Sequence, residues 1–229
     1  MAEQNQLDRQ KGVQVFEKTL LIEIGLFLVS LFFFVYIVHE VVLENDQELD
    51  NWGWKLVQPW RTPFMTDFMR TITWMGSWYF LVPAYLLLIF WFQLYRKRTR
   101  VSMEILSIGI TSTVVMFTLK EIFKRQRPLE PLLNAVPGFS FPSGHSFSSF
   151  TFFGLLIYII ADTKELSLSM KWFGSFICLL LATLIAISRV YLKVHYPSDV
   201  IAGFFLCVIW LGISFIVLHR LRGKRFLEV

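Results

Sequence analysis

Three polar clusters lie in the segment Lys120–Asp199: KEIFKRQRP (Lys120–Pro128), PSGH (Pro142–His145) and SRVYLKVHYPSD (Ser188–Asp199). Each cluster stands at the end of an apolar run long enough to cross a bilayer. Charged side chains beside lipid are costly, so their presence there indicates a function. We expect the rest of the chain to be the membrane scaffold that brings the three clusters together.

The composition is that of an integral membrane protein. Of 229 residues, 55% are hydrophobic and 17% aromatic, and the mean hydropathy of +0.55 is far above that of a soluble chain. The net charge is +5, but no basic stripe interleaved with aromatic residues lies outside the apolar runs, so nucleic-acid binding is not expected. Cys178 and Cys207 lie inside apolar runs, and we interpret them as small buried hydrophobes.

The apolar runs predict an all-α bundle of six membrane-spanning helices in a single domain, residues 1–229. The predicted spans are 19–43, 78–95, 101–119, 143–161, 172–188 and 200–218. The first run is too long for a signal-peptide core and no small-residue cleavage site follows it, so we expect it to stay as a span. Tryptophans concentrated in 44–70 predict short interfacial helices in the first outer loop.

Basic residues predict the orientation in the cell membrane. The polar tail 1–18, the loop Arg96–Arg100, the loop with Lys164 and Lys171, and the basic C-terminal end all fall on one side of the predicted bundle. The positive-inside rule makes that side the cytoplasm. Both termini are therefore expected in the cytoplasm, and the acidic loop that begins at Glu44 is expected outside, together with all three polar clusters.

In the first cluster, Lys120 and Arg127 are seven residues apart, so a helix that continues to Pro128 presents both on one face. Together they suit a phosphate, because arginine supplies a planar fork of donors and lysine a compact charge. The alternative is that both snorkel to lipid headgroups. For the neighbouring Lys124 and Arg125 we keep the snorkelling interpretation.

The second cluster, Pro142-Ser143-Gly144-His145, stands at the predicted start of a span, with proline where a first helical turn accepts it. The free N–H groups and the positive end of the helix dipole then form a seat for an anion. Gly144 lets the anion approach the backbone, and Ser143 adds a hydroxyl. His145 is suited to give a proton to an oxygen that leaves this anion. A plain helix start with an interfacial histidine is the alternative.

In the third cluster, Pro197 predicts the start of the last span, which places Asp199 in its first turn and His195 just before it. A carboxylate that holds one ring nitrogen as N–H leaves the other as a lone pair, which makes a histidine a nucleophile or base. Arg189, just beyond the predicted fifth span, adds a second guanidinium. A structural His–Asp pair that ties a loop is the alternative.

Considered together, these groups provide what phosphoryl transfer without a metal needs: charge neutralisation, a nucleophile and an acid. A metal site is not expected, because carboxylates are few, His145 and His195 have no close histidine or cysteine partner, and the nearby cations would repel a metal ion. No cofactor is expected either.

The three clusters resemble the signature of the type-2 phosphatidic acid phosphatases, a family that shares its site with vanadium haloperoxidases. The signature is Lys, six residues, Arg-Pro; then Pro-Ser-Gly-His; then Ser-Arg, five residues, His, three residues, Asp. The chain matches it without a departure, as Lys120…Arg127-Pro128, Pro142–His145 and Ser188-Arg189…His195…Asp199. A membrane bundle excludes the soluble haloperoxidase branch.

The resemblance implies that His195 attacks the phosphorus and forms a phosphohistidine, that Asp199 orients His195, and that His145 protonates the leaving group. It also implies that five residues hold the phosphoryl oxygens. These are Lys120, Arg127, Ser143, Gly144 and Arg189.

The resemblance further implies a lipid phosphate as substrate, whose tail enters sideways between helices, and no obligatory protein partner. The chain resembles both bacterial phosphatidylglycerophosphate phosphatases and undecaprenyl pyrophosphate phosphatases, and the three motifs do not separate them. We favour phosphatidylglycerophosphate; the alternative is undecaprenyl pyrophosphate, or a broad range of phosphatidic acid and lipid pyrophosphates. Outside the enzyme class, the alternative is a lipid-binding or transport protein that uses the same cations to hold a headgroup, but it leaves His145, His195 and Asp199 without a role.

Overall fold

The computed structural model describes residues 21–133 and 137–224, which contain helices and no strands. Six of these helices are long and apolar enough to cross a membrane. They are Leu21–Leu43, Trp78–Tyr95, Thr99–Phe123, Gly144–Asp162, Leu168–Tyr191 and Pro197–Leu218. The predicted all-α, six-span architecture is therefore confirmed, whereas the expected tail 1–18 lies outside the described residues.

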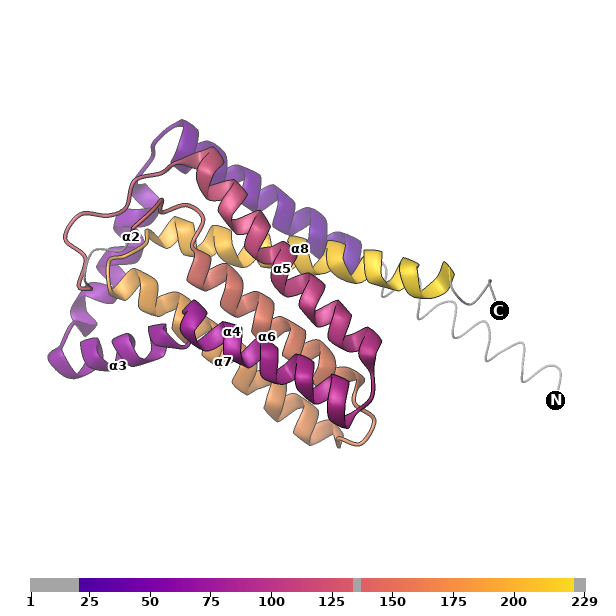
Figure 1. Ribbon diagram of the computed structural model, residues 1–229. Helices are drawn as coiled ribbons and strands as arrows, with labels where there is room; N and C mark the ends of the chain where they lie inside the picture. The colour runs from indigo at the N-terminus through magenta and orange to yellow at the C-terminus, as the bar shows by residue number, and fades with distance from the viewer. Residues whose placement is uncertain (1–20, 134–136, 225–229) are drawn as a thin grey trace, which may run out of the picture.

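The spans alternate in direction along the chain, and the longer connections, 44–77 and 124–143, lie at one end of the bundle. The first ends in a wide helical turn, η1 (Val38–Leu43), and the second consists of α4 (Trp78–Phe90) and a similar turn, η3 (Trp91–Tyr95). The other four are α5 (Thr99–Phe123), α6 (Gly144–Asp162), α7 (Leu168–Tyr191) and α8 (Pro197–Lys224). Helix α6 runs through the middle of the bundle and packs most extensively on α7 and α8 (Figure 1).

Helix α6 occupies the centre because it is apolar on two sides. One side joins α3, α4 and α7 in a core that includes Leu81, Phe152, Phe153 and Ile185. The other side joins α5 and α8 through Phe147, which is fully buried. The first span and α4 are mostly exposed, as expected for helices whose apolar side chains face lipid.

The connection between the first two spans folds into short helices, as predicted. These are α2 (Glu48–Val57), η2 (Gln58–Trp60) and α3 (Pro63–Trp74). Helix α3 begins with a proline in its first turn and with Thr62, whose hydroxyl oxygen accepts a hydrogen bond from the N–H of Met65 at 3.1 Å. The two helices α2 and α3 cover one end of the bundle, against α7 and α8 (Figure 1).

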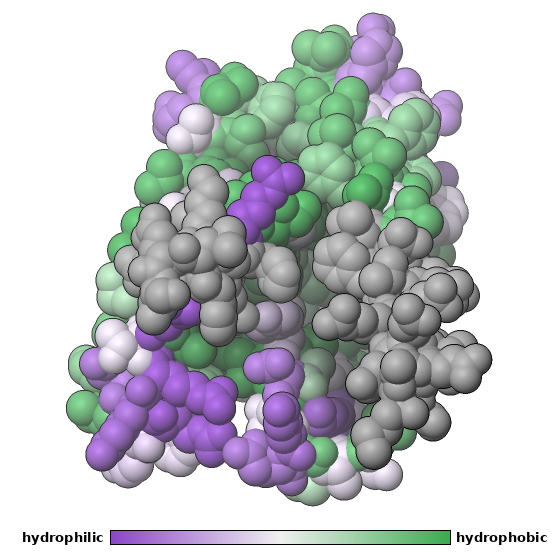
Figure 2. Space-filling model, turned by 90° about the vertical axis from the view of Figure 1, so that its right-hand side faces the viewer, coloured by the Kyte–Doolittle hydropathy of each residue, from purple (hydrophilic) through white to green (hydrophobic). Residues whose placement is uncertain are grey.

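The opposite end of the bundle carries the short basic connections. Figure 2 views the molecule from this end, where hydrophilic side chains form a patch below a largely apolar surface. Arg96, which follows η3, donates a hydrogen bond to Glu165 at 2.9 Å and so joins the two connections at this end. These charged residues lie far from the end that α2 and α3 cover.

Candidate active site

The three polar clusters meet at the covered end of the bundle, because four span ends converge there. The C-terminal ends of α5 and α7 and the N-terminal ends of α6 and α8 all lie at the same end of the bundle as α2 and α3 (Figure 1). The loop between α5 and α6 returns over the same end and contributes Ser140, which is fully buried.

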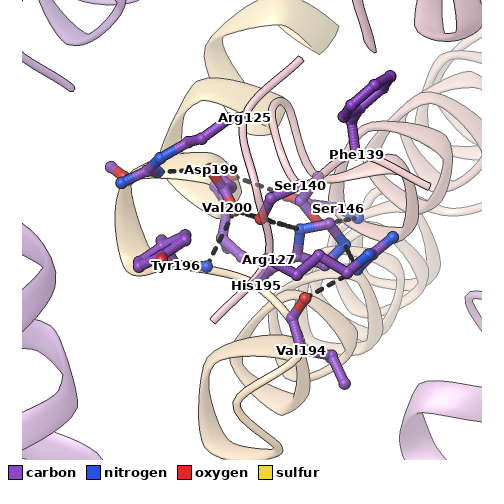
Figure 3. A network of polar contacts seen from close by, with 12 residues as sticks. Arg125, Arg127, Phe139, Ser140, Ser146, Val194, His195, Tyr196, Asp199 and Val200 are labelled. Carbon is purple, nitrogen blue, oxygen red and sulfur yellow. Dashed lines mark hydrogen bonds and ion pairs between the residues drawn. The ribbon is translucent and has the colours of Figure 1, made fainter. Parts of the chain in front are cut away.

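His195 and Asp199 form the centre of this site. Helix α8 begins at Pro197, so Asp199 lies in its first turn and His195 just before it. The Nδ1 atom of His195 is 3.3 Å from Oδ2 of Asp199, and both side chains are buried. The same carboxylate oxygen accepts hydrogen bonds from the hydroxyl of Ser140 and, at 2.9 Å, from the backbone N–H of Tyr196 (Figure 3).

The other ring nitrogen of His195 faces Arg127. The Nη1 atom of Arg127 lies 3.2 Å from Nε2 of His195 and also donates to the carbonyl of Val194 at 2.8 Å (Figure 3). A guanidinium only donates, so Nε2 is the nitrogen with the lone pair. The ring proton is then on Nδ1, toward Asp199. In this tautomer Nε2, the nitrogen with the lone pair, faces the guanidinium of Arg127, a group that can bind a phosphoryl group.

Lys120 and Arg127 reach the site from different backbone segments, so the prediction that both lie on one helix face is wrong. Helix α5 ends at Phe123, because Lys124 adopts a left-handed conformation (φ 48°) that turns the chain away. Lys120 remains on the helix, where its ammonium group donates to the carbonyl of Phe139 at 2.6 Å. Arg127 lies in the loop beyond Phe123.

The second cluster forms the N-terminus of α6. The helix begins at Gly144, with Ser143 as its cap and Pro142 before the cap, rather than in the first turn as expected. The hydroxyl oxygen of Ser143 accepts a long hydrogen bond from the N–H of Ser146 at 3.4 Å and keeps its own proton to donate. A Cβ atom on Gly144 would lie 3.7 Å from Cε of Lys120, so the lysine stem passes close to this helix start.

His145 and Arg189 are both held against the segment around α3. Gly76, which follows α3, packs so tightly that an added Cβ atom would lie 3.1 Å from the ring of His145. Arg189 is 2% exposed and belongs to α7 itself, not to the loop beyond it. Its Nη1 donates to the hydroxyl of Thr73 at 2.7 Å. Its Nε has no partner among the described residues, so one donor remains available for an anion.

Electrostatics favour the neutral form of His195. Burial lowers the pKa of His195 well below its ordinary value, and the positive charges of Arg189, Arg127 and Lys120 lower it further. The same burial lowers the pKa of Arg127, against the opposing effect of Asp199. A neutral imidazole among cations has its lone pair available for attack.

The interpretation of Arg125 as a snorkelling side chain is wrong. Its guanidinium donates to Oδ1 of Asp199 and to Oδ2 of Asp50, both at 2.6 Å. Neither Arg125 nor Asp50 was expected in the site from the sequence. The only signal for Arg125 in the sequence was a positive charge in a segment predicted to lie outside, where the positive-inside rule disfavours it. The neighbouring Lys124, which had the same interpretation, is exposed.

The predicted site residues therefore all lie at one end of the bundle. They are Lys120, Arg127, Ser143, Gly144, His145, Arg189, His195 and Asp199. Among the residues that the structure describes, no group of three or more His, Cys, Asp or Glu side chains is arranged to hold a metal ion.

Comparison with known proteins gives a family and two relatives. The model of the PAP2 superfamily matches residues 101–222. Phosphatidylglycerophosphatase B of Bacillus subtilis is 33% identical over 180 residues, which is 78% of this chain and 88% of that protein. Lipid phosphate phosphatase delta of Arabidopsis thaliana is 31% identical over 84 residues, which is 36% of this chain and 20% of that protein.

Two solved structures resemble the fold. The crystal structure of a transmembrane phosphatidylglycerolphosphate phosphatase of the PAP2 type from Bacillus subtilis matches with a TM-score of 0.70 and 28% identity, over 88% of this chain and 96% of that chain. The crystal structure of LpxE from Aquifex aeolicus matches with a TM-score of 0.52 and 30% identity, over 71% of this chain and 92% of that chain.

Proposed function

Because this chain belongs to the PAP2 superfamily and is a lipid phosphatase, we propose that it hydrolyses phosphatidylglycerophosphate to phosphatidylglycerol through a phosphohistidine on His195. The observation that carries this proposal is the orientation of the His195 ring, with Nδ1 toward Asp199 and Nε2 toward the guanidinium of Arg127. No metal ion takes part in the proposed reaction.

In the first step, the lone pair on Nε2 of His195 attacks phosphorus, and the bond from phosphorus to the ester oxygen breaks. The developing imidazolium is stabilised by Asp199 at its Nδ1–H. Arg127, Lys120 and Arg189 neutralise the phosphoryl oxygens, and the N-terminus of α6 at Ser143 and Gly144 receives one of them. The leaving alkoxide takes a proton from His145 and departs as the lipid alcohol.

In the second step, water replaces the imidazole on phosphorus. The now neutral His145 accepts a proton from this water as its oxygen attacks, and the bond between Nε2 and phosphorus breaks. Inorganic phosphate leaves, and His195 and His145 return to their starting states. The negative charge of a newly bound phosphate favours the protonated form of His145 for the next turnover.

The choice of phosphatidylglycerophosphate is supported by the relatives whose names refer to it. Both the Bacillus subtilis sequence and the first solved structure bear this activity in their names and cover most of this chain. The undecaprenyl pyrophosphate and phosphatidic acid alternatives use the same phosphoryl chemistry. They remain the substrates against which the proposal is to be tested.

The proposed face of action is the outer surface of the cell membrane. The basic connections after η3 and after α6 lie at the end of the bundle opposite the site. The positive-inside rule supports a cytoplasmic location for that end and for both termini. The phosphate of a lipid in the outer leaflet then lies level with His195, while its tail stays in the bilayer.

The deciding experiment measures phosphate release by the purified protein from phosphatidylglycerophosphate, phosphatidic acid and undecaprenyl pyrophosphate, each in excess EDTA. We expect full activity in EDTA, inhibition by vanadate, and the highest kcat/KM on phosphatidylglycerophosphate. His195→Ala is the inactive control. Activity lost in EDTA and restored by Mg²⁺ would contradict the mechanism, and a higher kcat/KM on another lipid would contradict the substrate.

A further inference from the structure

Asp50, on the short helix α2, is a fully buried carboxylate that the proposed reaction does not use. It is 0% exposed. Its Oδ1 accepts a hydrogen bond from the backbone N–H of Ser198, at the start of α8, at 2.8 Å. Its Oδ2 accepts one from Arg125 at 2.6 Å. A buried carboxylate is costly unless its partners are fixed, so this pairing calls for an explanation.

Arg125 links Asp50 to the catalytic carboxylate. Its Nη1 donates to Asp199 at 2.6 Å (Figure 3). The same Nη1 donates to the hydroxyl of Ser198 at 2.9 Å, and Nη2 donates to Asp50. The guanidinium also lies 3.8 Å from the ring centre of Tyr196. Burial opposes the charge, but Asp199 and Asp50 together raise the pKa of Arg125 above its ordinary value, so it stays a cation.

The charges of Asp199, Arg125 and Asp50 do not cancel. Two carboxylates face one guanidinium, so one negative charge remains. Without Asp50, the charge of Arg125 would offset that of Asp199, and the cations Arg127, Lys120 and Arg189 would dominate around the His195 ring. With Asp50 present, Asp199 keeps a net negative field toward the ring nitrogen that becomes positive during attack.

We propose that Asp50 and Arg125 are positioning residues of the active site, in which Arg125 fixes Asp199 against His195 and Asp50 balances the charge of Arg125. This inference rests on the proposed role of His195 as nucleophile. Neither residue touches the phosphate, so both act on the rate of attack rather than on substrate binding. The match to the PAP2 superfamily begins at residue 101, so Asp50 lies outside it.

The proposal predicts that removing Asp50 and removing Arg125 shift the pH profile of kcat/KM in opposite directions. The charged and titratable groups that act on His195 come from every element around it. They are Lys120 of α5, Arg127 of the following loop, His145 of α6, Arg189 of α7 and Asp199 of α8, with Arg125 of the same loop and Asp50 of α2 behind Asp199. Burial, and after it the positive charges of Arg189, Arg127 and Lys120, already lower the pKa of His195. Removing a nearby negative charge lowers this pKa further, and removing a nearby positive charge raises it.

The experiment compares Asp50→Asn, Arg125→Gln and the double variant in the full-length purified enzyme, with kcat, KM and the acidic limb of kcat/KM as readouts. Asp50→Asn is expected to lower kcat by about 10- to 100-fold, as for other residues that orient an active group from outside, with KM within about threefold of wild type. Its acidic limb moves to lower pH. Arg125→Gln also lowers kcat, but its acidic limb moves to higher pH.

The double variant restores the net charge beside His195 to that of the wild type, so its acidic limb is expected to return toward the wild-type position. Should either single variant fail to purify as a monodisperse protein, the double variant and the remaining single variant carry the same comparison. Asp67→Asn is the matched control, because Asp67 is an exposed carboxylate that pairs with Arg70 at 3.4 Å.

Unchanged kcat in Asp50→Asn, or limbs that stay in place or move in the same direction in both single variants, would overturn the inference. Two further controls separate its failure from that of the proposed function. If His195→Ala is inactive while Asp50→Asn behaves like Asp67→Asn, only the inference fails. If His195→Ala keeps wild-type activity, the proposed function itself fails.

Discussion

His195 has a different task for each of its ring nitrogens. Its Nδ1 faces Asp199 at 3.3 Å, and its Nε2 faces Arg127 at 3.2 Å. His145 lies on another helix, α6, next to Gly76. The two histidines therefore belong to separate elements, and in the proposed mechanism they serve separate steps, one at phosphorus and one at the leaving oxygen. This separation allows the two roles to be distinguished by the choice of substrate.

Replacing each histidine by alanine is expected to affect two substrates differently. His195→Ala removes the nucleophile, so activity should fall to background on both phosphatidylglycerophosphate and p-nitrophenyl phosphate. His145→Ala removes only the leaving-group proton, so it should lower kcat by about 10²- to 10⁴-fold on the lipid. It should cost much less on the aryl ester, whose leaving group barely needs that proton.

The measurement is the ratio of kcat for the two substrates, with folding checked by size-exclusion profile. If His145→Ala loses the same factor on both substrates while His195→Ala retains activity, the assignments of nucleophile and acid are reversed.

The sequence could predict the pairing of His195 with Asp199 and the meeting of the three clusters, but not the contact of Arg125 with Asp50. His195 and Asp199 are four residues apart around a helix start, so their contact follows from local geometry. Asp50 and Arg125 are 75 residues apart, on a short helix and a loop whose packing no local pattern reports. The αL turn at Lys124 redirected Arg127 and Arg125 together, and lysine gives no signal for such a turn.

Among the elements outside the spans, α2 supports the start of α8 in the site, as α3 supports Arg189. Gly53 packs against the first turn of α8 so closely that an added Cβ atom would lie 2.6 Å from Cγ of Pro197. This contact brings Asp50 within reach of Ser198. Trp54, the next residue, packs on Tyr196 with ring centres 5.2 Å apart. The glycine is therefore required by close approach of the two helices.

Gly53→Ala is expected to push α2 away from α8 and lengthen the contacts of Asp50. Overpacking of this kind costs about 1–3 kcal/mol in stability. It should also lower kcat, because Arg125 then loses its contact with Asp50, whose charge balances that of Arg125. The measurements are the thermal midpoint and kcat in the same detergent. Gly25→Ala is the matched control, since an added Cβ atom there meets nothing within 4 Å.

A Gly53→Ala enzyme with wild-type midpoint and kcat would contradict the role of the contact between α2 and α8.

Hydropathy located the spans but not their ends. Helices α5 and α7 extend beyond the predicted 101–119 and 172–188, to Thr99–Phe123 and Leu168–Tyr191. The added residues are polar or charged at several positions, so a hydropathy criterion stops before them although the backbone remains helical. Those helix ends carry Lys120 and Arg189, which is why the site lies on helix termini.

At the scale of the whole molecule, the active site and the basic connections lie at opposite ends of the bundle. The site occupies the end covered by α2 and α3, and the basic connections occupy the other end (Figures 1 and 2). This separation leads to the proposed orientation, with the site outward.

Cysteine labelling on intact cells tests that orientation. Leu129→Cys, at a position 85% exposed beside the site, should react with an impermeant thiol reagent. Thr99→Cys, at the opposite end of α5, should react only after the cells are permeabilised. The native Cys178 and Cys207 are buried, so the wild-type protein is the unlabelled control. The reverse pattern would mean that the site faces the cytoplasm.

The most direct test of the central claim is to trap the phosphoenzyme. The purified protein is mixed briefly with phosphatidylglycerophosphate labelled on its terminal phosphate, quenched in alkaline detergent and digested. We predict a label on the peptide that contains His195, stable to base and labile to acid as a phosphohistidine is, and no label on His195→Ala. Product release by the wild type without such a label, or a label that persists on His195→Ala, would contradict it.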